Sequence, residues 1–228
     1  MAQKRQLIVH DDAKSPIAEA YRTMRTNIQF AKVDNDLQVI MFTSAGPGEG
    51  KSTTTANAAV AMAQSGKKVI IVDCDLRKPV QHKIFSKRNR GVTNILVEDL
   101  PVADLIQDTG IDNLQVLTSG PIPPNPSELL GSAKMREIID CLKGLADIVI
   151  IDAPPTVAVT DACVLASGVD GILLVLGVGE IRPEMAQKAK ELLLKANGNI
   201  LGVILNKVEI EAEHAYYYYY YGNEKKAK

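Results

Sequence analysis

The segment Ala45-Gly46-Pro47-Gly48-Glu49-Gly50-Lys51-Ser52 decides the fold, because it has the composition of a phosphate-binding loop. It follows the short apolar run 39–43 and opens the alanine-rich segment 52–65, which predict a strand and a helix. Glycines let a backbone wrap closely around phosphate oxygens, and the amino end of a helix attracts negative charge. This order therefore predicts that Lys51 reaches the β- and γ-phosphates of a nucleotide and that Ser52 ligates Mg²⁺.

Most of the predicted nucleotide contacts come from this loop, in which Ala45 replaces the usual first glycine. A further contact, Asn206, ends the apolar run 202–205 and precedes Lys207. The pattern resembles the NKxD segment with which GTPases read guanine, but its aspartate is missing, so adenine is favoured. A strand-end turn is the alternative explanation of Asn206. The residues expected to contact the nucleotide are Gly46, Pro47, Gly48, Glu49, Gly50, Lys51, Ser52, Thr53 and Asn206.

Two further apolar runs end in aspartates. Residues 70–72 lead into Asp73-Cys74-Asp75, and residues 148–151 lead into Asp152. Because ligands of parallel sheets bind at the carboxyl ends of the strands, these carboxylates should face the phosphate loop. There they can hold a metal ion through water or accept a proton, although a single strand-end aspartate is equally typical of a cap or turn. The expected catalytic residues are Lys51, Asp73, Asp75 and Asp152, and the expected Mg²⁺ ligands are Ser52, Asp75 and Asp152.

Apolar runs that alternate with amphipathic segments predict an α/β fold of the P-loop NTPase type, with a doubly wound, mostly parallel sheet flanked by helices. Strands are expected at 39–43, 69–72, 114–117, 148–151, 171–176 and 202–206, and helices at 52–65, 134–143 and 183–197. Residues 15–33 predict another helix, which Ser15 caps and Pro16 begins. The prolines of residues 118–130 are too dense for helix or strand. We divide the chain into an N-terminal helical segment (1–35), a P-loop domain (36–208) and a flexible tyrosine-rich tail (209–228).

The composition excludes several classes of protein. The 228 residues carry a net charge of -1, which argues against nucleic-acid binding through bulk positive charge. No apolar run is long enough to cross a bilayer, and the polar first residues do not predict a signal peptide. Three separated cysteines, Cys74, Cys141 and Cys163, predict small, buried, reduced thiols rather than disulfides or a zinc site. With three Phe and no Trp, the core must be aliphatic.

Six of the seven tyrosines are consecutive, at Tyr216, Tyr217, Tyr218, Tyr219, Tyr220 and Tyr221. Six in a row cannot form one amphipathic face, and a short strand would bury only alternate ones. Either the run is a poorly ordered terminus, or it accepts phosphate at several positions, each phosphate adding about -1.5 to -2 charges.

Taken together, these motifs resemble those of the bacterial tyrosine kinases, P-loop enzymes tied to capsular and extracellular polysaccharide export. The similarity includes residues 42–53, 72–79 (VDCDLRKP), 124–130 (PNPSELL), 152–155 and the tyrosine run. The chain is similar to the separate cytoplasmic kinase subunit of that family. The resemblance implies a Walker A motif at Gly46 to Ser52, a Walker A′ motif at Asp73 and Asp75, and a Walker B motif at Asp152. Septum-site and partition ATPases carry a signature lysine where this chain has Gly46.

The resemblance implies a non-specific protein-tyrosine kinase that uses ATP and Mg²⁺, phosphorylates its own tail in trans, and regulates polysaccharide synthesis and export. Asp73 would then orient or deprotonate the tyrosine hydroxyl, although the division of roles among the three aspartates stays open. Glu19, Arg22 and Arg25 form an ExxRxxR motif. Spacing alone indicates a solvated helix face, whereas the family uses the motif to build a ring-shaped homo-oligomer, an octamer. Arg77 and Lys78 either attract the acidic tail or lie in a solvated loop.

The implied partners are further copies of the chain, protein tyrosine substrates, a cognate tyrosine phosphatase, and the cytoplasmic end of a transmembrane adaptor. The chain would be cytoplasmic and recruited by the adaptor to the inner face of the membrane. The rival hypothesis is a nucleotide-switched scaffold like the septum-site and partition ATPases, without kinase activity. The tyrosine tail and Gly46 count against it, and a DNA-partitioning role would need a basic surface that the charge balance does not offer.

Overall fold

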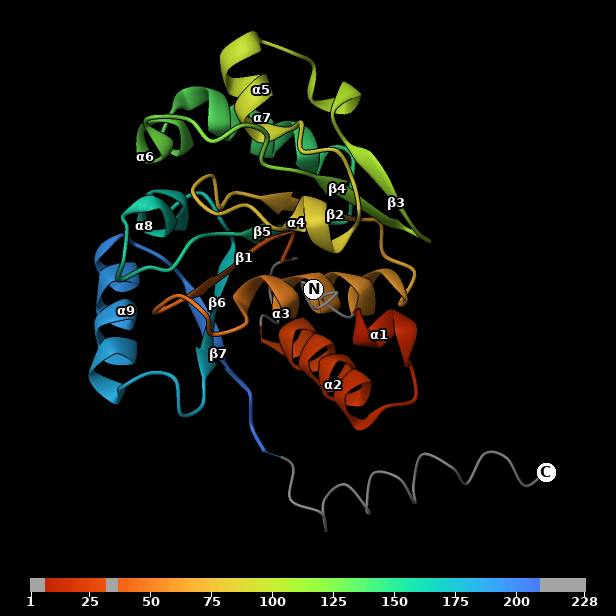
Figure 1. The fold of residues 1–228 in the computed structure, drawn as a ribbon, viewed down its shortest axis with the longest axis vertical. Coiled ribbons are helices and arrows are strands. Elements are labelled where there is room, and N and C mark those ends of the chain that lie inside the picture. The colour runs from red at the N-terminus through yellow and green to blue at the C-terminus, as the bar shows by residue number, and fades with distance from the viewer. Residues whose placement is uncertain (1–6, 32–36, 210–228) are drawn as a thin grey trace, which may run out of the picture.

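The computed structural model describes residues 7–31 and 37–209, which build one seven-stranded sheet in the order β3-β4-β2-β5-β1-β6-β7 (Figure 1). Every neighbouring pair is parallel except β3 and β4, which are antiparallel. The predicted doubly wound P-loop fold is therefore confirmed. The strands are β1 (Val39–Ser44), β2 (Val69–Asp73), β3 (Gln107–Ile111), β4 (Leu114–Leu117), β5 (Ile148–Asp152), β6 (Gly171–Gly177) and β7 (Ile200–Asn206).

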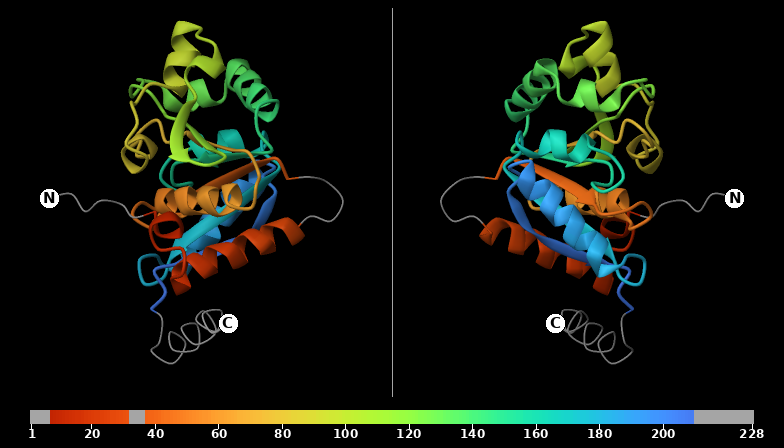
Figure 2. Two further views of the ribbon diagram at one scale, coloured as in Figure 1. Left: turned by 90° about the vertical axis from the view of Figure 1, so that its right-hand side faces the viewer. Right: turned by 90° about the vertical axis from the view of Figure 1, so that its left-hand side faces the viewer.

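Helices cover both faces of this sheet, as expected for strands that are apolar throughout. Side chains such as Phe42, Ile71 and Ile150 pack against α1, α2 and α3, which lie together in every view of Figures 1 and 2. The alternate residues, such as Met41 and Val72, pack against helices α5 to α9. The helices are α1 (Ile8–Asp11), α2 (Pro16–Phe30), α3 (Lys51–Ala63), α4 (Gln81–Ile84), α5 (Val92–Glu98), α6 (Pro126–Leu130), α7 (Ala133–Lys143), α8 (Asp161–Ala166) and α9 (Pro183–Lys195).

The core is aliphatic, as the composition requires. Of the aromatic residues that the structure describes, Phe42 and Phe85 are buried, Tyr21 is half-buried, and Phe30 is exposed. Isoleucine, valine, leucine and alanine fill both layers between sheet and helices.

The strand order brings the predicted site residues to one edge of the sheet. β5 lies between β1 and β2, and Asp152 is the register partner of both Phe42 and Asp73. The carboxyl ends of β1, β2 and β5 therefore deliver the phosphate loop, Asp73 and Asp152 to the same place.

Helix α2 begins as predicted, because the Ser15 hydroxyl accepts a hydrogen bond from the backbone N–H of Ala18 and Pro16 occupies the first turn. It packs directly on α3 and buries Ala18 and Ile28. Residues 1–6, 32–36 and 210–228, including the tyrosines predicted to accept phosphate, lie outside the described residues. The proposed division at residues 35 and 208 stays a prediction.

Three sequence-based expectations need correction. Residues 126–130 of the proline-rich connection form helix α6, because Pro126 stands at the first helical position, where its missing N–H costs no hydrogen bond. The antiparallel strand β3 was not predicted, since its polar residues lack an apolar run. Cys74 is buried, but Cys141 is exposed on α7 and Cys163 is half-buried.

Among residues 7–31 and 37–209, no helix combines the length and hydropathy that a bilayer span requires.

Candidate active site

The phosphate loop joins β1 to α3 and adopts backbone angles that favour glycine. Gly48 and Gly50 have φ values of +84° and +85°, which side chains other than glycine rarely adopt. A Cβ atom on Gly50 would also lie 2.0 Å from Nδ2 of Asn206. That amide donates a hydrogen bond of 2.8 Å to the carbonyl of Glu49. The structure therefore brings Asn206 to the loop, as predicted, while its contact with a base stays a prediction.

The side chain of Glu49 connects the phosphate loop to the end of β6. Its Oε1 accepts a hydrogen bond of 2.5 Å from the Gly46 N–H, and its Oε2 accepts one of 2.9 Å from Gly177 at the end of β6. The residue is buried. The carboxylate thus ties the loop to the sheet, and the predicted contact of Glu49 with the nucleotide stays a prediction.

Lys51 lies at the centre of the site and is surrounded by carboxylates. Only 6% of the residue is exposed, and its ammonium group pairs with Asp152 Oδ1 and lies 3.7 Å from Asp75 Oδ2. It also donates to Ser52 Oγ at 3.2 Å. Burial acts to lower the pKa of Lys51, but the charges of Asp152 and Asp75 outweigh it and raise the pKa. The lysine is therefore positively charged at neutral pH, as phosphate binding requires.

Asp73 is fully buried, and both of its oxygens accept hydrogen bonds from backbone N–H groups. Oδ2 accepts from Val80 at 3.0 Å and from Gln81 at 2.9 Å, and Oδ1 accepts from Asp75 at 3.2 Å. Burial, reinforced by the charge of Asp152, raises the pKa of Asp73 to about 8. A carboxyl group with such a pKa can take or release a proton near neutral pH, and its hydrogen bonds also organise the loop after β2.

Asp75 faces Lys51 from that same loop. It is slightly exposed, at 7%, and its Oδ1 accepts a hydrogen bond of 3.0 Å from the Lys78 N–H. The structure thus brings together all four predicted catalytic residues. It also places Ser52, Asp75 and Asp152, the predicted oxygen ligands of Mg²⁺, around one ammonium group, and hydroxyl and carboxylate oxygens fit that ion.

Arg77 belongs to a network that the sequence did not reveal. Its guanidinium donates to both carboxylate oxygens of Asp161, at 2.9 Å and 3.0 Å, and to Ser127 Oγ at 3.2 Å. Asp161 is fully buried, and it raises the pKa of Arg77 through these hydrogen bonds. The Arg77 side chain is 40% exposed, so both interpretations, a residue of a solvated loop and one that attracts the tail, stay predictions. Its contacts fasten the loop after β2 to α8 and to residues 124–130, and no local pattern signals a pair 84 residues apart.

The ExxRxxR motif divides into two parts on α2. Arg22 and Glu19 form an ion pair of 2.6 Å on the exposed side of the helix, while Arg25 donates a hydrogen bond of 3.0 Å to the Ala61 carbonyl of α3. Glu19 and Arg22 are therefore accessible, and their role in oligomerisation stays a prediction.

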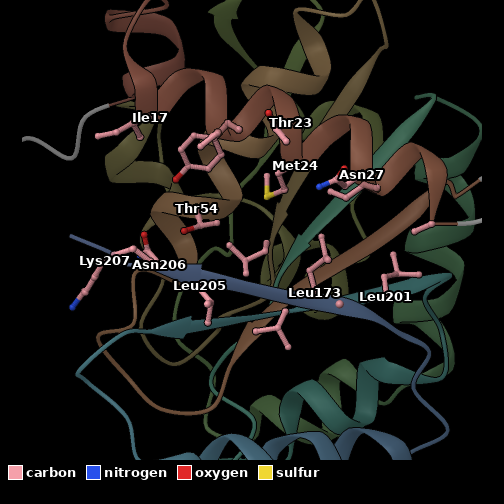
Figure 3. Close-up of a pocket in the computed structure, with 18 of the residues that line it drawn as sticks. Ile17, Thr23, Met24, Asn27, Thr54, Leu173, Leu201, Leu205, Asn206 and Lys207 are labelled. Atoms are coloured by element: carbon pink, nitrogen blue, oxygen red, sulfur yellow. The ribbon is translucent and has the colours of Figure 1, made fainter. Parts of the chain in front are cut away.

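A groove of about 700 Å³ runs between α2 and β7, from Asn206 and Lys207 past Thr54 (Figure 3). Figure 3 shows Met24 of α2 and Leu201 of β7 on the two sides of this groove. The chain leaves the described part of the molecule beside this groove, because Val208 also lines it.

Comparisons with known proteins agree with this geometry. The family described as AAA domain matches residues 37–180. Tyrosine-protein kinase YwqD of Bacillus subtilis (strain 168) is 46% identical over 216 residues, which are 93% of this chain and 91% of that protein. The chain belongs to the bacterial tyrosine-protein kinase family. This confirms the recognition from sequence, and the kinase is an enzyme of the protein-tyrosine kinase class.

Solved structures of similar proteins share the fold of the kinase. The chimerical protein CapA2B2 superposes with a TM-score of 0.86 and 44% identity, over 90% of each chain. The septum site-determining protein MinD of Pyrococcus horikoshii OT3, solved with Mg-ADP, superposes with a TM-score of 0.63 and 28% identity, over 79% of this chain and 76% of that chain. The kinase therefore shares the MinD fold but resembles tyrosine kinases more closely in sequence.

Proposed function

We propose that the kinase transfers the γ-phosphoryl group of ATP to tyrosine hydroxyls, including those of its own residues Tyr216 to Tyr221. The observation that carries the proposal is the convergence of Lys51, Ser52, Asp75 and Asp152 at the mouth of the phosphate loop. These groups supply a cation for phosphate oxygens and oxygen ligands for a divalent metal.

In this proposal the backbone of the loop and Lys51 bind the phosphates, and Ser52, Asp75 and Asp152 hold Mg²⁺. The metal, when bound, neutralises charge that develops on the phosphate oxygens. MinD of Pyrococcus horikoshii, which has this fold, was solved with Mg-ADP, and this supports the pairing of nucleotide and metal. Because Lys51 already pairs with Asp152, phosphate binding competes for its charge and loosens that pair.

The tyrosine hydroxyl needs a group that orients it and takes its proton, since its ordinary pKa is about 10. Asp73 is the proposed group, supported by its pKa of about 8. Asp73 is buried, however, and its oxygens already accept three backbone hydrogen bonds. Asp75 is more exposed and is therefore the competing candidate. Asp73→Asn and Asp75→Asn, compared at saturating ATP and over a range of pH, separate the two, because only the base removes the ascending limb of the pH–rate profile.

We further propose that the tail is phosphorylated in trans. The described chain leaves the sheet at Asn206, beside the phosphate loop, so a tail that served its own site would have to reverse tightly. Residues 207–215 span at most about 30 Å when extended, enough to reach a neighbouring copy in a ring. Phosphorylation then makes the tail acidic and expels it from a site lined by carboxylates, which loosens the ring.

A mixing experiment tests this reaction. A Lys51→Met chain that keeps its tail is incubated with Mg²⁺-ATP and an active chain truncated after Ala215. Phosphotyrosine should appear on the inactive, tailed chain, as read by mass spectrometry. If that chain stays unlabelled while the intact kinase labels itself at a rate independent of protein concentration, the reaction occurs in cis.

The ring is proposed to form through Glu19, Arg22 and Arg25. Replacing all three with Ala should convert the oligomer to a monomer in light scattering while α2 remains helical, because alanine is a good helix former. Since Arg25 also contacts α3, the single Arg25→Ala variant is the control for loss of that internal hydrogen bond. An unchanged assembly in the triple variant would show that the motif is only a solvated face.

In the cell, we propose that the chain is cytoplasmic and binds the cytoplasmic end of a transmembrane adaptor, which activates it at the inner face of the membrane. It would phosphorylate protein tyrosine substrates and regulate capsule or exopolysaccharide synthesis and export. A tyrosine phosphatase would remove the phosphate again. An anti-phosphotyrosine blot of the purified chain, with and without an adaptor peptide, separates this proposal from the scaffold alternative. A scaffold would hydrolyse ATP and give no signal in either sample.

A further inference from the structure

Gln81 lies where the three nucleotide-binding motifs meet. It is the first residue of α4 and is fully buried. Its backbone N–H donates to Asp73 of the Walker A′ motif at 2.9 Å. Its side-chain Nε2 donates to Asp152 Oδ2 of Walker B at 2.7 Å and to the Ser52 carbonyl of Walker A at 3.1 Å. One residue therefore contacts all three motifs.

The orientation of the Gln81 amide is fixed by these neighbours. Both side-chain partners, a carboxylate and a carbonyl, can only accept hydrogen bonds, so the amide nitrogen must face them and the oxygen must face away. Among the residues that the structure describes, Oε1 finds no hydrogen-bond partner, although it is buried. A buried acceptor without a donor destabilises a protein, and an apolar side chain of the same length would avoid that cost. The amide is kept at this position despite that cost, which indicates that the contacts of its nitrogen are the reason for it.

The amide nitrogen reaches the predicted metal site, because it contacts Asp152 and the backbone carbonyl of Ser52. Both of these residues are proposed Mg²⁺ ligands. Asp152 uses Oδ1 for Lys51 and Oδ2 for Gln81, so the amide also sets which oxygen faces the centre of the site.

We propose that Gln81 is a positioning residue for the metal: its Nε2 orients the carboxylate of Asp152, a proposed ligand of nucleotide-bound Mg²⁺. The inference rests on the proposed magnesium–nucleotide site and adds a residue to it. Groups that orient metal ligands in this way typically change metal affinity by about 10–100-fold when they are replaced.

The test compares two glutamine-to-methionine variants, because methionine keeps the length of glutamine and lacks its amide. Gln81→Met removes the proposed contact. Gln38→Met is the matched control: Gln38 Nε2 also donates to two acceptors, the carbonyls of Lys143 at 2.7 Å and Ala146 at 3.0 Å, but it precedes β1 at the opposite end of the sheet. The affinity of each full-length chain for a fluorescent ADP analogue is measured in EDTA and in Mg²⁺, and Mn²⁺ binding to the ADP complex is followed by electron paramagnetic resonance.

For Gln81→Met we expect Mn²⁺ to bind about 10-fold or more weakly and the gain in ADP affinity from Mg²⁺ to shrink by the same factor, with metal-free ADP affinity unchanged. Gln38→Met should match the wild type in all three measurements. Equal losses with and without metal, or no loss at all, would overturn the inference. If Mg²⁺ did not increase the affinity of the wild-type chain for the ADP analogue, the proposed function would fail instead. Gln81→Asn, which keeps the amide but withdraws it by one methylene, carries the same expectation should Gln81→Met not fold.

Discussion

The pair between Arg77 and Asp161 should contribute more to stability than the exposed ion pairs of residues 7–31 and 37–209. Arg77→Ala leaves the fully buried carboxylate of Asp161 with Ser127 as its remaining side-chain donor. Removing one partner of a buried pair costs about 3–5 kcal/mol, and because 40% of the Arg77 side chain is exposed we take the lower end, about 3 kcal/mol. For a chain of this size, that loss lowers Tm by about 6–12 °C.

The assay is chemical denaturation of the nucleotide-free chain, followed by circular dichroism. Arg77→Lys should recover only part of the loss, since one ammonium group cannot make both hydrogen bonds of the guanidinium. Arg90→Ala is the matched control: Arg90 lies 3.8 Å from Glu98 in an exposed pair, for which we expect at most about 1 kcal/mol. If Arg77→Ala cost no more than Arg90→Ala, the pair would not hold the loop, and attraction of the acidic tail would again be the better account of Arg77.

Three further outcomes follow from the site. Lys51→Met should abolish tyrosine phosphorylation and also destabilise the nucleotide-free chain by about 3 kcal/mol, because it leaves Asp152 buried without its cation; a kinase assay and a melting curve check both. Gly50→Ala should lose nucleotide binding, whereas Gly66→Ala, at φ +87° with open space around it, should cost only the strain of about 1–2 kcal/mol; calorimetric titration with ADP distinguishes them. Because the pKa of Asp73 is raised from 3.8 to about 8, its stabilising contribution is present below about pH 4 and is lost as pH rises through 8. Asp73→Asn should therefore flatten the fall in the free energy of unfolding over that range, and an unaltered slope would contradict the shift.

Much of the architecture could be predicted because the signals of long apolar runs and of the glycine-rich loop depend on residues that are close together in the sequence. Residues 148–151 are apolar throughout and end in Asp152, and a strand buried on both faces is the usual result. The same rule correctly brought Asp73 and Asp152 to one edge of the sheet. Short elements gave no such signal: α4 has only four residues, and β3 alternates half-buried and exposed polar positions.

The site was predictable at the level of motifs but not of partners. Lys51 was expected to meet phosphate, yet its ion pairs with Asp75 and Asp152 depend on how three strands align. Gln81 was missed because its contacts reach residues 29 and 71 positions away in the chain. The bond between the Glu49 carboxylate and Gly177 at the end of β6 is equally non-local, because it joins residues 128 positions apart.

The aliphatic core leaves residues 7–31 and 37–209 of this kinase with one tyrosine and no tryptophan. The chain has no tryptophan and seven tyrosines, six of which form the run 216–221. Tyr21, the seventh, is half-buried beside Thr54, and burial raises the pKa of its phenol, so it stays un-ionised in ordinary buffers. Near-ultraviolet absorption and emission of the unlabelled protein therefore come overwhelmingly from the proposed acceptor segment. Phosphate esterification of a phenol moves its absorption to shorter wavelength and weakens its emission, so the molecule carries an optical signal of its own modification with little background from the fold.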